Sequence, residues 1–136
     1  MNRLPDWRAR LYKTISTYEQ KPFQYGFCDC AIFGSDIIQA ITGDDPAQHF
    51  RGRYKTKIGG LRAIRKAGFR DQVDYLEKTF ETIHPAFAQV GDLGLIDTEE
   101  GPAIVVVLGA FAAGLGSDGL VRFQISEITK AFKVGG

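Results

Sequence analysis

Several features that define other classes of protein are scarce in this chain. Its 136 residues hold only two cysteines and two histidines. The C-x-C pair Cys28 and Cys30 would need both His49 and His84 to complete a zinc site, because there is no second cysteine pair. A disulfide across one intervening residue would be strained. The sequence therefore predicts free thiols in a reducing cytoplasm, with no metal site and no cofactor.

Long apolar runs and an excess of charge of one sign are also missing. The longest apolar stretch, residues 103–108, is too short to cross a bilayer, and we expect no signal peptide because no apolar run lies near the N-terminus. The formal net charge of +1 provides no general attraction to nucleic acid or to a membrane surface. What remains is an ordinary globular composition, so we expect one domain over residues 1–136.

The strongest local signal lies in residues 23–33. Asp29 is a favourable N-cap, and apolar residues follow Cys30 at the spacings of three and four that mark one face of a helix. Gly43 stands where a glycine commonly ends a helix. This pattern predicts a helix with Cys30 in its first turn and its apolar face turned inward.

Cys30 has two interpretations at that position. The unpaired N–H groups at a helix start stabilise a thiolate, which is how a cysteine nucleophile is activated. The carboxylate of Asp29 opposes this effect, because a neighbouring negative charge raises the pKa of a thiol. The alternative is that Cys30 is a small buried core residue, as free cysteines commonly are.

The rest of the chain predicts helices first and strands afterwards. We expect further helices over residues 5–19, 61–67 and 73–80, and strands over residues 93–96, 103–108, 111–115, 120–125 and 132–134. Helices followed by a small antiparallel sheet indicate an α+β fold.

Three motifs follow one another along the chain. They are the aromatic-glycine turn Tyr25-Gly26, Asp29-Cys30 at a helix start, and Gly91-Asp92 at the start of a hairpin. In this order the chain resembles the NlpC class of papain-like cysteine peptidases, which cleave the peptide stems of bacterial cell walls. The resemblance implies a papain-like, NlpC-type single domain with Cys30 at the position of the nucleophile. Ala31 and Ile32 replace the Ser-Gly that follows the cysteine in that class.

The catalytic histidine of that class has no counterpart here. Its position falls on Ala103 or Pro102, and the third polar residue of the triad would lie in residues 111–113, which are all apolar. His84 and His49 remain as candidates for a base that reaches Cys30 from elsewhere in the fold, because a triad is defined by its geometry. Without a base, the resemblance implies a peptidase-like fold without activity.

A second, more specific set of motifs occupies residues 23–30, 42–45, 53–54, 91–92 and 119–120. In these the chain is similar to small proteins encoded among phage and prophage tail genes. That resemblance implies a minor structural or assembly component of a phage-type tail tip (baseplate), made in the bacterial cytoplasm and located in the virion tail. Its partners would be other tail-tip or hub proteins, with peptidoglycan as a second candidate. The alternatives are an active peptidase or amidase that cleaves peptidoglycan with Cys30 as nucleophile, and a module that binds a wall fragment or a metal.

Two segments are candidate partner surfaces. Arg51, Arg53 and Lys55 alternate around Tyr54, which suits contact with acidic residues of a partner. Residues 110–116 are small and uncharged, which is typical of a flat edge that a partner covers. The alternatives are that aspartates within the fold, Asp44, Asp45, Asp71 and Asp74, neutralise the basic segment, and that residues 110–116 form the interior of the sheet.

Overall fold

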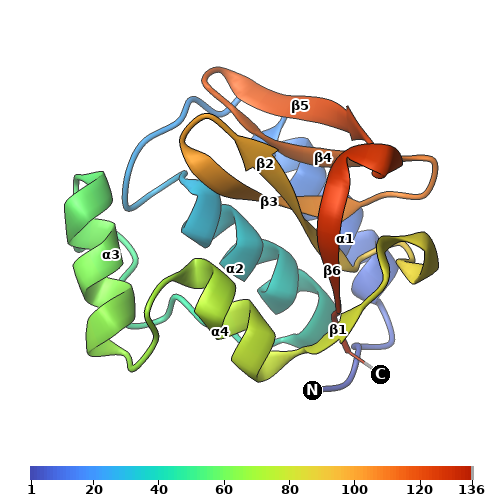
Figure 1. The fold of residues 1–136 in the computed structure, drawn as a ribbon, viewed down its shortest axis with the longest axis horizontal. Helices are drawn as coiled ribbons and strands as arrows, with labels where there is room; N and C mark the ends of the chain where they lie inside the picture. The colour runs from blue at the N-terminus through green and yellow to red at the C-terminus, as the bar shows by residue number, and fades with distance from the viewer. Residues whose placement is uncertain (136) are drawn as a thin grey trace.

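Helices precede strands along the chain, and the α+β prediction is confirmed (Figure 1). The computed structural model describes residues 1–135, so Gly136 lies outside the described residues. The helices are α1 (Trp7–Tyr18), α2 (Cys30–Thr42), α3 (Lys57–Lys66) and α4 (Gln72–Thr79). The strands are β1 (Glu81–Ile83), β2 (Leu93–Thr98), β3 (Gly101–Val107), β4 (Phe111–Gly116), β5 (Gly119–Gln124) and β6 (Ile128–Lys133), with 3-10 turns η1 (Pro85–Phe87) and η2 (Ile125–Glu127).

The strands form one antiparallel sheet in the order β1-β6-β2-β3-β4-β5. The small-residue strand β4 therefore pairs with β3 on one side and with β5 on the other, and Ala112 and Ala113 are buried. The prediction that residues 110–116 present an open apolar edge is wrong for β4. Residues 111–116 instead form an interior strand of the sheet, which was the alternative for this segment.

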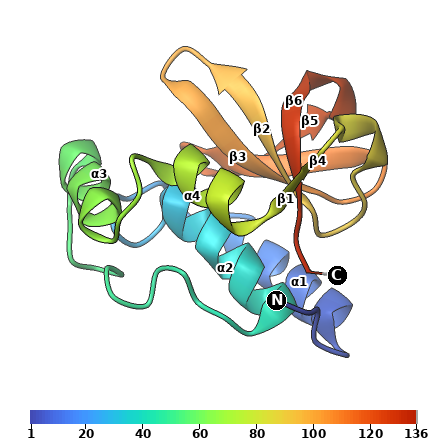
Figure 2. The ribbon, with the colours of Figure 1, turned by 60° about the horizontal axis from the view of Figure 1, so that its bottom comes forward.

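The core lies on both faces of this sheet. α2 lies across one face with α1 beside it, and their apolar side chains pack against alternate residues of β3, such as Ile104 and Val106 (Figure 2). The residues between them, Val105 and Val107, face a smaller apolar cluster on the other side of the sheet. Successive side chains of β3 point to opposite faces of the sheet, and both faces are covered. Every residue from Ile104 to Val107 is therefore buried.

The predicted limits of α2 are confirmed at both ends. The Asp29 carboxylate accepts the Ile32 N–H at 2.9 Å, and Gly43 ends the helix in the left-handed conformation with φ of 86°. α3 begins earlier than predicted, at Lys57, because Thr56 caps it by accepting the Gly59 N–H. β1 was not predicted, and it is a three-residue edge strand with little periodicity to detect.

The Gly-Asp motif before β2 joins the two ends of the chain. Asp92 is buried and accepts N–H groups from Gln89 and Val134, and it forms a salt bridge with Arg3 at 3.0 Å. Arg3 also donates to the Val134 carbonyl at 2.8 Å. The motif is therefore part of the framework, at the opposite end of α2 from Cys30.

α3 is the least integrated helix. Gly60 is its only buried residue, and in both ribbon views it lies beyond α4, away from the sheet (Figures 1 and 2). Among residues 1–135, no helix combines the length and the apolar character that crossing a membrane requires.

Candidate functional site

An open cleft lies at the start of α2, where the loop before α2, the helices α3 and α4 and the β2–β3 hairpin come together. Its volume is about 730 Å³. Cys30 lines it, half-buried, in the first turn of α2. The walls are mostly apolar and aromatic, and they include Phe23, Tyr25, Leu61, Ile64, Val73 and Leu115.

Two amide groups donate toward the Cys30 sulfur. The backbone N–H of Ile104, on β3, lies 3.0 Å from Sγ, and the Nε2 of Gln72, at the start of α4, lies 3.5 Å away. The Gln72 amide also reaches the Pro102 carbonyl at 3.4 Å. Gln72 therefore connects α4 to β3 across the sulfur.

Burial raises the pKa of the Cys30 thiol above its ordinary value. The hydrogen bonds from Ile104 and Gln72 act in the opposite direction, and the negative charge of Asp29 adds to the increase. Burial prevails, so the sulfur keeps its proton at neutral pH. The raised pKa favours the interpretation of Cys30 as a largely protonated thiol over that of an activated nucleophile.

Asp29 is a buried hydrogen-bond acceptor that connects several segments. Besides the Ile32 N–H, it accepts the Gly26 N–H at 2.8 Å and the hydroxyl of Tyr54. Gly26 has φ of 87°, and its carbonyl accepts the Gly52 N–H at 2.8 Å. These contacts fix the loop before α2 against the segment that leads to α3, and together they shape one end of the cleft.

The predicted partner surface at residues 51–55 is only partly on the surface. Tyr54 is buried. Its burial raises the pKa of its hydroxyl, and the hydrogen bond to Asp29 raises it further. Arg51 forms salt bridges with Asp45, at 2.9 Å, and with Asp36. The expected neutralisation within the fold thus holds for Asp45, whereas Asp74 pairs with Arg70 and Lys78. Arg53 and Lys55 are exposed.

Neither histidine lines the cleft. His49 is exposed in the segment after α2, and His84 is exposed before η1, where its Nδ1 accepts the Ala86 N–H at 3.0 Å. The positions that the resemblance gives to the missing histidine, Pro102 and Ala103, do line the cleft beside Cys30. The positions for the third triad residue, 111–113, do not line it.

Gln72 was missed in the sequence. It lies 42 residues from Cys30 and Ile104 lies 74 residues away, so only the tertiary fold brings them together. Both cysteines are free, and Cys28 is fully buried in the loop before α2. In the described part of the chain, no three potential ligands among His, Cys, Asp and Glu gather as a metal site.

Because alkylation requires the thiolate, this environment predicts slow modification of Cys30. At neutral pH, iodoacetamide should react with Cys30 in the native protein more slowly than with free cysteine, and the rate should keep rising at a pH where free cysteine has levelled off. Peptide mass spectrometry of timed samples measures this, with the urea-unfolded protein as control. A native rate above that of the unfolded chain would indicate an activated nucleophile.

A comparison with protein families matches residues 2–134 to a domain of unknown function, DUF6950. A comparison with curated proteins finds no match.

Proposed function

The chain belongs to the DUF6950 family, and from the similarity of its motifs to those of small tail-gene proteins we propose that it is a minor structural or assembly component of a phage-type tail tip. Its fold, in this proposal, is a papain-like fold of the NlpC type. Its thiol packs between α2, α4 and β3 and does not cleave peptide bonds.

The papain-like assignment is supported by the position of Cys30 relative to the sheet. A cysteine in the first turn of a helix lies against the middle of a sheet strand, with its Sγ 3.0 Å from the Ile104 nitrogen. The resemblance places the catalytic histidine on that same strand, at Pro102 or Ala103. In this proposal Pro102 or Ala103 stands in place of the base, and neither side chain can accept a proton.

The observation that carries the non-catalytic role is the set of groups around the Cys30 sulfur. Its two hydrogen-bonding neighbours, the Ile104 N–H and the Gln72 amide, are donors that cannot remove a proton. A cysteine peptidase needs a base within hydrogen-bond reach of its thiol. Removing the base from such a unit costs several orders of magnitude in rate.

We expect Cys30→Ser to leave particle assembly and infectivity unchanged. Serine keeps an acceptor for the Ile104 N–H at nearly the same place, so the cost is a small change in packing. Plating efficiency of particles that carry the substitution measures this, with Cys28→Ser as the matched control at the neighbouring cysteine.

Mass spectrometry of purified particles tests the location of the protein. The absence of the protein from the particles would overturn the proposal.

An active cysteine peptidase or amidase is the second candidate, because Cys30 is half-buried and lines an open cleft. A turbidity assay on purified cell walls separates the two. Clearing by the unmodified protein, abolished by Cys30→Ser, would establish the hydrolase and exclude the purely structural role.

A further inference from the structure

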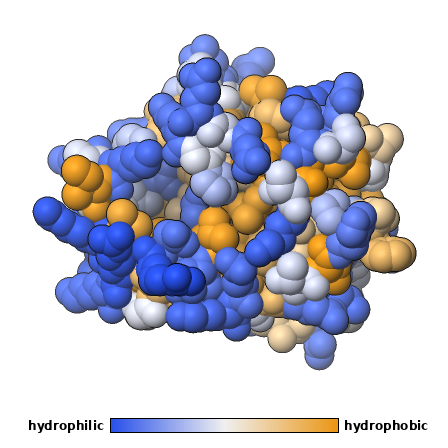
Figure 3. Space-filling model, viewed as in Figure 1, coloured by the Kyte–Doolittle hydropathy of each residue, from blue (hydrophilic) through white to orange (hydrophobic). Residues whose placement is uncertain are grey.

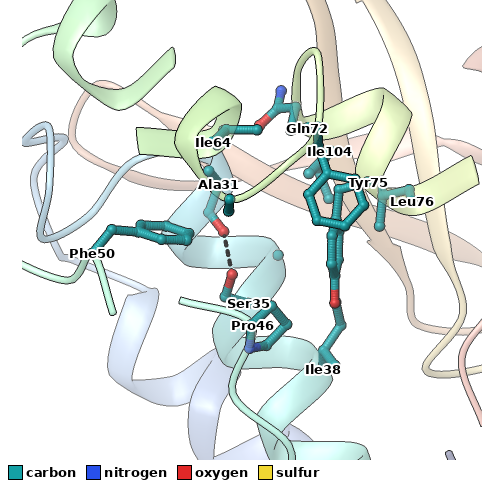
Figure 4. A pocket seen from close by; sticks show the side chains of 13 residues that line it. Ala31, Ser35, Ile38, Pro46, Phe50, Ile64, Gln72, Tyr75, Leu76 and Ile104 are labelled. Atoms are coloured by element: carbon teal, nitrogen blue, oxygen red, sulfur yellow. Dashed lines mark hydrogen bonds between the residues drawn. The ribbon is translucent and has the colours of Figure 1, made fainter. Parts of the chain in front are cut away.

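A small apolar chamber lies directly behind the cleft. Residues of α2, α3, α4 and β3 enclose it, together with Pro46 and Phe50 from the segment after α2 (Figure 4). Four residues line both spaces, namely Ala31, Ile64, Gln72 and Ile104, so the chamber and the cleft adjoin at these side chains. A group bound in the cleft therefore lies next to the chamber.

The chamber suits an apolar group. The polar side chains that line it are those of Ser35, Gln72 and Tyr75, and the Ser35 hydroxyl already donates to the Ala31 carbonyl at 2.8 Å (Figure 4). The chamber volume is about 60 Å³. This is a small space, large enough for more than one water-sized probe, so we take a leucine or isoleucine side chain as the group that it holds. A phenylalanine or tryptophan ring is larger and is expected to fit less well.

The charged side chains at the rim of the cleft are mostly acidic. Glu99 and Glu100 at the tip of the β2–β3 hairpin, with Asp71 at the start of α4, place three carboxylates around the cleft, whereas Lys57 is the one cation that lines it. Among the described residues, none of these four side chains takes part in a salt bridge within 4.0 Å. The rim thus carries more negative than positive side chains, which favours a basic group on the ligand.

α3 forms the outer wall with apolar side chains that the fold leaves uncovered. Leu61 and Ile64 are half-buried, and Ile58 is 64% exposed. Apolar surface is visible over α3 among hydrophilic residues (Figure 3). A ligand in the cleft would cover Leu61 and Ile64 from the open side, which adds apolar contact to the site.

We propose that the cleft and its chamber bind an extended segment of a neighbouring protein, with a leucine or isoleucine side chain in the chamber and a lysine or arginine at the acidic rim. A peptide is the occupant that joins an aliphatic group and a cation on one flexible chain, as extended segments do when they anchor alternate side chains in pockets. The identity of that neighbour as a tail protein rests on the proposed function. The binding chemistry does not rest on it.

The test uses the purified full chain and fluorescein-labelled synthetic peptides of L-amino acids. Each peptide carries one leucine in a serine-glycine background, with a lysine at successive positions after it. We expect saturable binding for at least one spacing, and roughly tenfold weaker binding when alanine replaces the leucine. The same peptide with phenylalanine in place of leucine, or glutamate in place of lysine, should also bind more weakly.

Variants of the protein locate the bound segment. Ala31→Leu places a larger side chain at the mouth of the chamber and should weaken binding roughly tenfold. Ala9→Leu, on an exposed position of α1, is the matched control and should change nothing. Glu99→Gln with Glu100→Gln should weaken binding several-fold and reduce its dependence on salt. The substitutions at Glu99 and Glu100 lie on the surface, so they still test the site of binding if the Ala31→Leu variant fails to fold.

Methyl NMR gives a readout of the chamber itself. The Ile64 and Ile104 methyl resonances should shift on peptide addition, whereas those of Ile128, in the apolar cluster on the other face of the sheet, should not. Absence of binding for every L-peptide would overturn the inference, and so would binding of soluble muropeptides alone. Neither outcome bears on the presence of the protein in tail particles, which mass spectrometry decides separately.

Discussion

Asp29→Ala is expected to lower the free energy of unfolding by about 3–5 kcal/mol, because it removes an N-cap and leaves buried donors without an acceptor. Asp29 is 3% exposed and accepts hydrogen bonds from Ile32, Gly26 and Tyr54. A loss of this size is a large part of the roughly 5–15 kcal/mol that stabilises a typical domain. Urea denaturation followed by circular dichroism measures it.

Asp71→Ala is the matched control for this change. Asp71 is also an aspartate N-cap, accepting the Asp74 N–H at 2.8 Å, but it is exposed and its one hydrogen bond is local. Its replacement should cost about 0.5–2 kcal/mol, the usual value of a cap. Tyr54→Phe, which removes one of the three donors, should fall in the same range. Equal effects of Asp29→Ala and Asp71→Ala would show that Asp29 acts only as a cap.

Gly26→Ala is expected to destabilise the protein by about 2–5 kcal/mol, from backbone strain and a backbone clash together. Gly26 has φ of 87°, and an added Cβ would lie 2.2 Å from the Tyr54 carbonyl oxygen. A carbonyl oxygen cannot move aside as the end of a flexible side chain can. The loop before α2 would have to separate from residues 52–54, which opens one end of the cleft.

The comparison with Gly68→Ala separates the two causes. Gly68 has φ of 101°, but an added Cβ there meets nothing within 4 Å. Its replacement should cost only the strain of the left-handed backbone, about 1–2 kcal/mol. Thermal and urea unfolding of both variants provide the measurement. If Gly26→Ala and Gly68→Ala lower the free energy of unfolding by the same amount, the contact between Gly26 and Tyr54 does not contribute to stability.

Much of the secondary structure could be predicted because its signals are local. Asp29 and Gly43 mark the two ends of α2, and both act as predicted. The start of α3 was placed too late, since the pair Gly59 and Gly60 lowers helix propensity where the helix begins. Those glycines are explained only by the fold, because a Cβ on Gly60 would lie 2.8 Å from the Tyr54 ring.

The site was less predictable, because its parts come from distant positions. The spacing of Arg51, Arg53 and Lys55 is typical of a surface segment, yet Tyr54 turns inward to a carboxylate 25 residues earlier. Sequence periodicity also does not give the order of strands in a sheet, so the burial of β4 between two neighbours could not be derived. The position of Cys30 in the first turn of α2 was predicted, whereas the amide donors around its sulfur were not.

The salt bridge between Arg3 and Asp92 has a practical consequence for handling the molecule. Arg3, which also donates to the Val134 carbonyl, thereby connects the N-terminal and C-terminal segments beside the C-terminal end of α2, where Leu4 donates its N–H to the Ile41 carbonyl at 2.8 Å. Cys30 lies at the other end of this 13-residue helix, roughly 20 Å away at the helical rise per residue. A purification tag, a fluorophore or a surface tether attached at either terminus would therefore leave the mouth of the cleft facing solvent.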